Sequence, residues 1–445
     1  MLIRGGTVID ERGVRRADVR TSGEEIAEVG RALVPAAGEE VTDASGAYVI
    51  PGAIDVHTHL DLPVGEVRSA DDFLSGTVAA ACGGTTCVID FAGAGREPWR
   101  VALETWHAKA AGLATVDYGL HLTVTELPEG SEDARARFEQ FAAAGVTSVK
   151  LYMAYPDRLM VDDETIGRAL ASSPPTGVRV CVHAEDQAVI DRCGSRPPEA
   201  EVSAIRRAAA LARAAGAELY IVHLSSAAGL EAIRAARAEG TRLLCETCPQ
   251  YLLLDGSALS GPAGRDYVCS PPLRTAADRA ALWTALGSGE VEIVSTDHCP
   301  FTRADRRRDP GHVPGGLPGV ETRLALAYQG VRDGRLTLER WVDAVTGAPA
   351  RHFGLRHRKG ALRPGLDADL VIFDPAARRR LDAANLHSRS DHSPYQGLEV
   401  TGWPALTLSR GRVVARDGEP ADVEPGWGRY VARHLSAAQP RHSAH

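Results

Sequence analysis

The chain has 445 residues, of which 44% are hydrophobic and 24% charged, and its formal net charge is −8. A chain of this length can form two or three domains, or one large barrel with an addition, and can bury an active site. It lacks the basic stripe that nucleic acid or an anionic membrane would need, so we expect neither as a partner. The opening residues, MLIRGGTVID, lack the pattern of a signal peptide, and no stretch approaches the roughly 18 apolar residues of a membrane helix. We therefore expect a cytoplasmic protein.

Short strands separated by turns are predicted at both ends of the chain. They lie at 2–10, 17–29, 369–374 and 404–416. Because the two ends carry the same kind of pattern, we expect them to pair as one small β-sandwich. Helical segments at 320–333 and 337–347 would lead the chain back to it.

Between these ends, short runs rich in β-branched and apolar residues alternate with stretches of helical length. The eight runs are 53–58, 85–91, 117–124, 148–153, 179–184, 218–224, 241–247 and 291–297. The helical stretches, rich in Ala, Arg and Glu, include 98–112, 130–144, 199–215, 227–239 and 276–287. Strand followed by helix eight times is the pattern of a (β/α)8 barrel, whose active site lies at the C-terminal ends of its strands.

The predicted fold class is therefore α/β, a (β/α)8 barrel with a small β-sandwich built from both ends of the chain. We place the first part of the sandwich at 1–50, the barrel at 51–355 and the second part of the sandwich at 356–426. Residues 427–445, rich in arginine and histidine, are expected to form a C-terminal tail, either flexible or an arm between subunits.

The stretch PGAIDVHTHLD, residues 51–61, places His57 and His59 at the end of the first barrel strand. Residues two apart on a strand project to the same face, so the two imidazoles point the same way at the mouth of the barrel. Taken alone, the pair has an ordinary explanation as hydrogen-bonded residues at the rim.

Four further strand ends carry groups that bind metals or exchange protons: Lys150 in SVKLYMAY, His183 in VCVHAED, His223 in YIVHLSS and Asp297 in IVSTDHCPF. Taken alone, each is better explained as a core residue with its hydrogen bonds made than as a metal ligand. Four histidines and an aspartate that meet at one barrel mouth are hard to explain without a metal. Imidazole together with carboxylate suits zinc or a similar divalent ion.

These motifs, together with CETCPQYL, YVCSPPLR and GGLPGVETR, resemble those of the cyclic amidohydrolases, and most closely hydantoinase and dihydropyrimidinase. The resemblance spans residues 1–430. It implies two divalent metal ions, bridged by a lysine that carbon dioxide has carboxylated. Carried over residue by residue, His57, His59 and Asp297 would hold the more buried ion, His183 and His223 the other, and Lys150 would bridge both.

The composition supports a special role for Lys150, because only three of the 50 basic residues are lysines. Only a neutral amine can form a carbamate, and burial favours the neutral form of lysine but practically never that of arginine. An interior lysine could otherwise be a Schiff-base nucleophile or a salt-bridged structural residue.

The resemblance also implies a mechanism. Water activated by the metals would attack the ring amide carbonyl, Asp297 would pass its proton to the leaving nitrogen, and Tyr155 would stabilise the oxyanion. Ser270 and the residue at position 315 would bind the amide edge of the ring, largely through the main chain. Hydantoinases usually carry asparagine where this chain has Gly315, so the backbone contact would be kept and the side chain lost.

The expected substrate is a small cyclic ureide or imide, such as a hydantoin or a dihydropyrimidine. Allantoinase is the alternative, although the second strand ends in VIDFA, as in hydantoinases. Dihydroorotase is less favoured, because Asp61 replaces its substrate-binding arginine and would repel the substrate carboxylate. A non-catalytic scaffold like the collapsin-response mediators would have lost its ligands, whereas all six positions are filled here. Family members associate, so we also expect a homotetramer or a homodimer.

Overall fold

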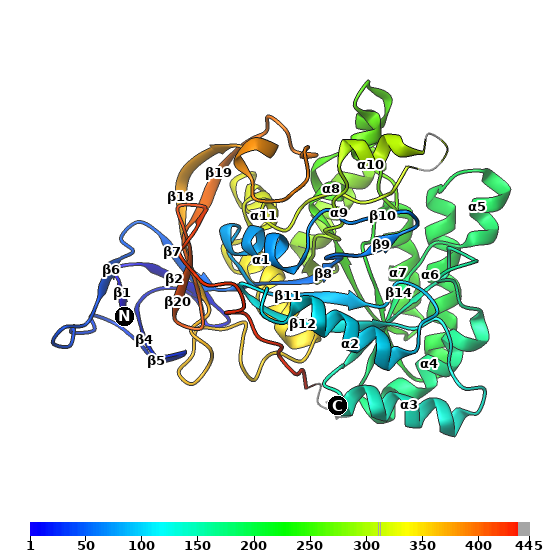
Figure 1. Ribbon diagram of the computed structural model, residues 1–445, viewed down its shortest axis with the longest axis horizontal. Coiled ribbons are helices and arrows are strands. Elements are labelled where there is room, and N and C mark those ends of the chain that lie inside the picture. The colour runs from blue at the N-terminus through cyan, green and yellow to red at the C-terminus, as the bar shows by residue number, and fades with distance from the viewer. Residues whose placement is uncertain (310, 312, 435–445) are drawn as a thin grey trace.

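A computed structural model describes residues 1–309, 311 and 313–434. Figure 1 shows three layers from left to right: a small sheet, a larger sheet and a barrel surrounded by helices. The N-terminus lies in the small sheet, so the chain builds part of the sandwich before it enters the barrel.

Eight parallel strands follow one another around the barrel in chain order. They are β8 (Ala53–Thr58), β11 (Thr85–Ala92), β12 (Asp117–Thr123), β13 (Ser148–Tyr152), β14 (Arg179–His183), β15 (Glu218–Ile221), β16 (Arg242–Thr247) and β17 (Ile293–Val294). The ring closes where Thr58 bridges His298 in parallel, just beyond β17. The predicted (β/α)8 barrel is therefore confirmed.

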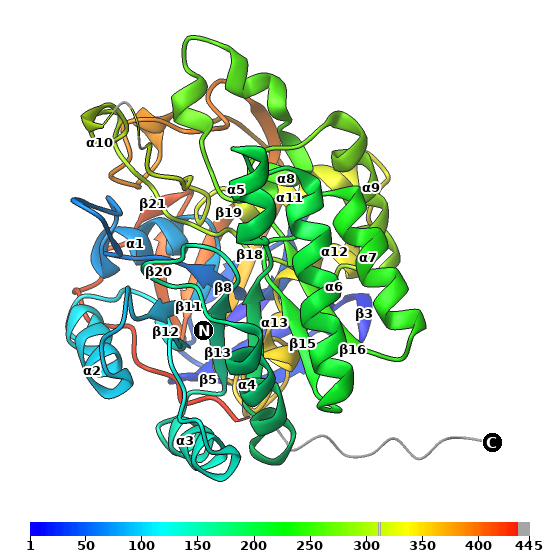
Figure 2. The same ribbon diagram turned by 90° about the vertical axis from the view of Figure 1, so that its right-hand side faces the viewer.

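Helices cover the outside of the barrel, and Figure 2 shows several of them side by side. They include α1 (Phe73–Cys82), α2 (Trp99–Ala110), α3 (Ser131–Ala143), α4 (Asp163–Thr176), α6 (Pro198–Ala214), α7 (Ala227–Ala238) and α9 (Ala276–Ser288). Helix α6 shows why such segments fold here, because its small apolar residues recur every three or four positions and form the buried face. The five helical stretches predicted from the sequence are all helices, whereas α1 and α4 lie outside them. After β17 come α10 (Arg303–Arg308), α11 (Arg323–Arg332), α12 (Leu338–Val345) and α13 (Gly347–His352).

Both ends of the chain build the sandwich, as predicted. One sheet has the order β5-β4-β1-β6 and the other β21-β20-β19-β18-β7-β2-β3. Their strands are β1 (Leu2–Arg4), β2 (Thr7–Asp10), β3 (Gly13–Arg16), β4 (Asp18–Ser22), β5 (Glu25–Gly30), β6 (Val41–Asp43), β7 (Tyr48–Pro51), β18 (Leu370–Arg380), β19 (Glu399–Ser409), β20 (Arg412–Arg416) and β21 (Glu419–Pro420). Ile3 and Val19 of the first sheet share one apolar core with Val8 and Leu370 of the second.

Segments from the end of the chain close the N-terminal end of the barrel. Phe353, just after α13, and Val431 pack into the same apolar cluster as the interior of β8. Arg433 is fully buried and donates a hydrogen bond to Ser148 Oγ at 2.8 Å. The first residues of the expected C-terminal tail therefore lie against the barrel, and the later ones fall outside the described residues. None of the helices in the described part of the chain is long and apolar enough to span a membrane.

Candidate active site

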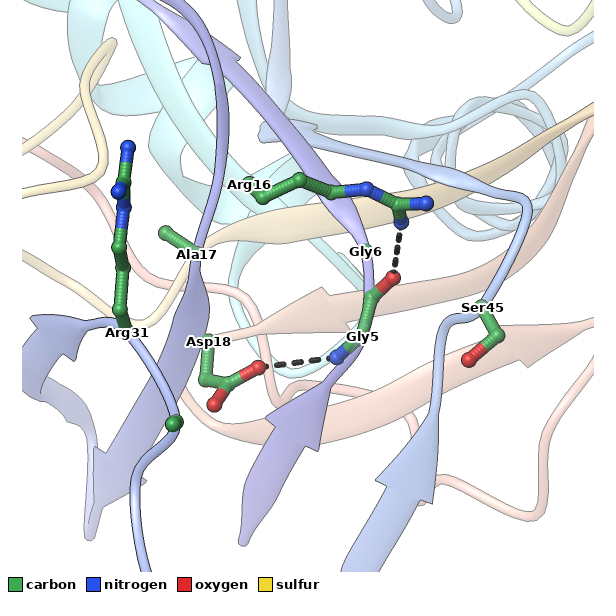
Figure 3. Close-up of a pocket in the computed structure, with 8 residues that line it drawn as sticks. Gly5, Gly6, Arg16, Ala17, Asp18, Arg31 and Ser45 are labelled. Atoms are coloured by element: carbon green, nitrogen blue, oxygen red, sulfur yellow. Dashed lines mark hydrogen bonds between the residues drawn. The ribbon is translucent and has the colours of Figure 1, made fainter.

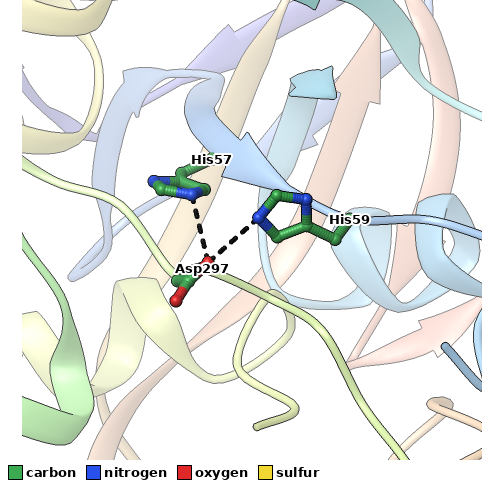
Figure 4. Close-up of side chains that lie close together, drawn as sticks. All are labelled: His57, His59 and Asp297. Atoms are coloured by element: carbon green, nitrogen blue, oxygen red, sulfur yellow. Dashed lines mark ion pairs between the residues drawn. The ribbon is translucent and has the colours of Figure 1, made fainter. Parts of the chain in front are cut away.

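His57, His59 and Asp297 form a compact buried cluster at the mouth of the barrel (Figure 4). The histidines lie at the end of β8 and the aspartate lies just beyond β17, the two strands where the ring closes. Asp297 Oδ1 is 3.0 Å from His57 Nε2 and 3.2 Å from His59 Nε2. Each of the three residues therefore points one ligand atom, an imidazole nitrogen or a carboxylate oxygen, toward the same place.

The surroundings of His57 suit a cation in this cluster. Its Nδ1 lies 2.5 Å from Glu246 Oε1, and because a carboxylate only accepts, one ring proton sits on Nδ1. The other ring nitrogen of His57, Nε2, faces the Asp297 oxygen. It either carries a second proton or presents an unprotonated lone pair to that oxygen. Burial and Lys150 oppose a charged ring, but Asp297 and Glu246 outweigh them and raise the pKa of His57. A proton or a metal ion between His57 and Asp297 fits this donor set.

His183 and His223 form a second pair beside the first. His183 Nδ1 lies 2.9 Å from His223 Nε2, and His183 Nε2 lies 2.9 Å from Glu185 Oε2. Burial holds the pKa of both histidines well below the usual value, so both rings are neutral. Nδ1 of His223 has no hydrogen-bond partner among the described residues. Two neutral imidazoles that turn nitrogens toward each other are suited to share one metal ion.

Lys150 lies in β13 between these groups and is fully buried. Its Nζ is 2.9 Å from His57 Nε2 and 4.1 Å from the centre of the Phe91 ring. Burial lowers the pKa of Lys150, although Asp297 and Glu246 act in the opposite direction. The amine therefore gives up its proton more readily than an exposed lysine would.

Three of the expected site residues have left-handed backbone conformations, which are uncommon for residues other than glycine. The φ angle is +40° at His223, +54° at Asp297 and +70° at Tyr155. Such conformations cost about 1–3 kcal/mol each and persist where the surrounding structure enforces them. Here they turn side chains at three different strand ends toward one mouth.

Tyr155, Ser270 and Gly315 lie around this cluster. The centre of the Tyr155 ring is 5.3 Å from that of His183, and burial raises the pKa of Tyr155 to about 12, so its hydroxyl keeps its proton. A Cβ added at Gly315 would lie 3.3 Å from Ser270 Oγ. Gly315 thus leaves free the space beside the Ser270 hydroxyl that a side chain would occupy.

Comparison with known proteins agrees with this geometry. The model of the Amidohydrolase family matches residues 48–414. This chain belongs to that family. It is 42% identical to the D-hydantoinase of Geobacillus stearothermophilus, over 97% of this chain and 96% of that protein.

Solved structures of the same family are similar over nearly the whole length. The D-hydantoinase from Bacillus sp. AR9 has 41% identity and a TM-score of 0.93, covering 98% of this chain and 99% of its own. The dihydropyrimidinase from Brevibacillus agri NCHU1002 has 39% identity and a TM-score of 0.93, covering 99% of both chains. This amidohydrolase therefore shares the barrel and the sandwich with its relatives.

Two glutamates contact histidines of the expected site and were not found from the sequence. Glu246 contacts His57 and also accepts a hydrogen bond from the Tyr220 hydroxyl at 2.7 Å. Glu185 contacts His183 and accepts from Arg196 at 2.5 Å. The available signal was a charged residue near the end of a predicted strand, since Glu246 lies in the run 241–247.

Asp61 does not face the site as an unpaired charge. Its carboxylate lies 2.8 Å from Arg68 Nη1 and 3.3 Å from Lys109 Nζ. Two cations compensate part of its charge, which weakens the repulsion that it would exert on a substrate carboxylate. The preference for a hydantoinase over a dihydroorotase therefore rests mainly on the similarity to hydantoinases.

A hollow lies elsewhere, in the sandwich (Figure 3). Its volume is about 640 Å³, and it is open to solvent beside Gly5. Asp18 accepts a hydrogen bond from the Gly5 amide at 2.9 Å, and Arg16 donates to the Gly5 carbonyl. These polar groups bind the backbone at Gly5 itself.

Proposed function

We propose that this amidohydrolase opens the cyclic amide bond of hydantoins or dihydropyrimidines by hydrolysis. The observation that carries the proposal is the meeting of four histidines, a lysine and an aspartate from five strands at one mouth. The full-length similarity to a D-hydantoinase and a dihydropyrimidinase supports the substrate class.

The residues fit two divalent ions, with zinc as the proposed metal. His57, His59 and Asp297 would hold one ion and His183 and His223 the other. Lys150, carboxylated by carbon dioxide, would bridge them, and its lowered pKa supports that reaction. When bound, such ions lower the pKa of water toward neutrality and polarise a carbonyl oxygen.

Asp297 and Tyr155 would move and hold protons during the reaction. Burial opposes ionisation of Asp297, but His57 and His59 outweigh it and hold its pKa well below the usual value. Asp297 is therefore ionised and can accept a proton from the attacking water, then deliver it to the leaving ring nitrogen. The protonated Tyr155 hydroxyl would donate a hydrogen bond to the carbonyl oxygen as negative charge develops there. The carbon–nitrogen bond breaks, and the water oxygen ends in the new carboxylate.

The main chain at Ser270 and Gly315 would hold the amide edge of the ring. The two positions are adjacent, which supports a shared role. Backbone amide and carbonyl groups pair with an amide edge whatever the side chain, so ring binding would survive the absence of asparagine at Gly315.

Hydrolysis assays on the metal-reconstituted protein test this proposal. The substrates are hydantoin, a 5-substituted hydantoin, dihydrouracil, allantoin and dihydroorotate. We expect turnover of hydantoins or dihydrouracil, loss of activity after chelation, and recovery with added zinc. Turnover of only allantoin or only dihydroorotate would overturn the proposal, and a preparation inactive on all five would favour a scaffold.

The assembly and location remain predictions. Family resemblance supports a homotetramer or a homodimer, and the protein is predicted to be cytoplasmic. Light scattering coupled to size-exclusion chromatography measures the assembly directly, and a monomeric mass would contradict the prediction.

A further inference from the structure

Arg306 in α10 is a fully buried cation whose contacts are unusual. Its Nη1 donates to the carbonyl oxygens of Arg265 at 2.9 Å, Val268 at 3.3 Å and Pro314 at 3.3 Å, and its Nη2 donates to that of Gly316. Its hydrogen-bond acceptors among the described residues are all backbone carbonyls. The guanidinium therefore binds backbone carbonyl groups through both of its terminal nitrogens.

The four carbonyls belong to two segments that are far apart in sequence. One segment, 265–268, leads directly to Ser270, and the other, 314–316, contains Gly315. The segments also contact each other, because the Gly316 amide donates to the Val268 carbonyl at 3.0 Å. Arg306 therefore ties together the two stretches that the proposed function assigns to the ring.

We propose that Arg306 is a positioning residue for the substrate, fixing the separation between the Ser270 and Gly315 backbones that hold the amide edge of the ring. This inference rests on the proposed function, since it concerns that same binding site. Arg306 lies outside the metal cluster and does not touch the reacting atoms.

The chemistry of the side chain explains why arginine is needed there. A guanidinium presents several N–H groups in a rigid plane, so one side chain can span carbonyls from two segments. A lysine keeps the charge but carries it on a single flexible atom and cannot hold the same pair of segments at a fixed separation. Removing the side chain takes from the Pro314 and Gly316 carbonyls the donor that they have here, and the 314–316 segment would move away from 265–268 to find water.

The test compares Arg306→Lys and Arg306→Ala with Arg307→Ala, which changes an exposed arginine of the same helix. Kinetics with hydantoin and metal content are measured for each. We expect KM to rise about tenfold or more in both Arg306 variants, with kcat changed far less, because uniform ring binding is lost. Metal content stays at the wild-type level, and Arg307→Ala keeps the wild-type KM.

Guanidinium at low millimolar concentration provides a second readout. It should enter the space left in Arg306→Ala and lower its KM toward the wild-type value, with no effect on Arg307→Ala. If Arg306→Ala does not fold, the KM of Arg306→Lys decides. Arg306 variants that lose thermal stability but keep the wild-type KM would overturn the inference, because the role would then be structural. A wild-type protein that hydrolyses no cyclic amide would instead refute the proposed function.

Discussion

Lys150 and Lys359 are both fully buried, yet their surroundings differ sharply. Lys359 lies between the barrel and the sandwich, with its Nζ at 2.8 Å from Asp117, 2.9 Å from Asp367 and 2.6 Å from Asp369. Lys150 has His57 as its hydrogen-bond partner among the described residues and lies over the face of Phe91.

These surroundings decide whether each site favours the charged or the neutral form of its lysine amine. Burial lowers the pKa of Lys359, but Asp369 and Asp117 outweigh it, so that pKa is raised well above the usual value. At Lys150 burial prevails and the pKa is lowered. Lys359 is therefore held as an ammonium between the barrel and the sandwich, whereas Lys150 gives up its proton more readily than an exposed lysine would.

Replacing Lys150 by arginine should have the largest effect. Arginine keeps a positive charge and cannot form a carbamate, so we expect metal loss and a fall in kcat/KM on the order of 10⁴ or more. Metal analysis and hydantoin hydrolysis measure both quantities. Near-normal activity with full metal content would show that a reactive amine is not needed.

Replacing Lys359 by methionine should instead affect stability. Three carboxylates would lose the cation that they share, although Asp117 keeps Arg410 and Asp367 keeps Arg358. We expect a loss of about 3–5 kcal/mol in the free energy of unfolding. The matched variant Lys150→Met, in the metal-free protein, should lose only about 1 kcal/mol, because one hydrogen bond is removed. Urea unfolding measures both, and equal losses would contradict the distinction between the two lysines.

The variant Glu246→Gln makes a smaller change to the surroundings of Lys150, because it alters the contact between Glu246 and His57. The glutamine can still accept from His57 but carries no charge, so it holds the ring less firmly and makes its other nitrogen a weaker ligand. We expect a loss of about 10–100-fold in metal affinity, measured by competition with a chelator. Unchanged affinity would mean that the 2.5 Å contact to His57 does not tune the site.

Above neutral pH, the stability contributed by Lys359 should depend on pH only in strongly alkaline solution. Its pKa is raised by folding above the ordinary 10.5, so the contribution is complete between neutral pH and 10.5 and is lost as pH rises through the folded value. The stability difference between the wild type and Lys359→Met should be constant from neutral pH and then shrink by up to about 1.4 kcal/mol per pH unit. A difference that already shrinks between neutral pH and 9 would contradict the raised pKa.

Much of the fold was predictable, because alternation of strand and helix is a local pattern that survives in one sequence. The six proposed metal-binding positions, among them His57 and Lys150, could be named from the sequence because each lies in or just beyond a barrel strand and matches a family motif.

Other features depend on contacts between distant residues and could not be predicted. Glu246 acts on a histidine 189 positions away, and the carbonyls that Arg306 binds come from two separate loops. Lys359 lies in the basic stretch RHRKGALR, where nothing local shows that Asp117 will lie beside it. Burial and charge pairing belong to the folded chain, so they appear only in the structure.

Carbon-13 NMR of the metal-replete protein, reconstituted with labelled bicarbonate, tests the central claim most directly. The account predicts one carbamate signal per chain that is absent from Lys150→Arg and retained in Lys359→Met. An active, metal-replete protein with no labelled carbamate would contradict it.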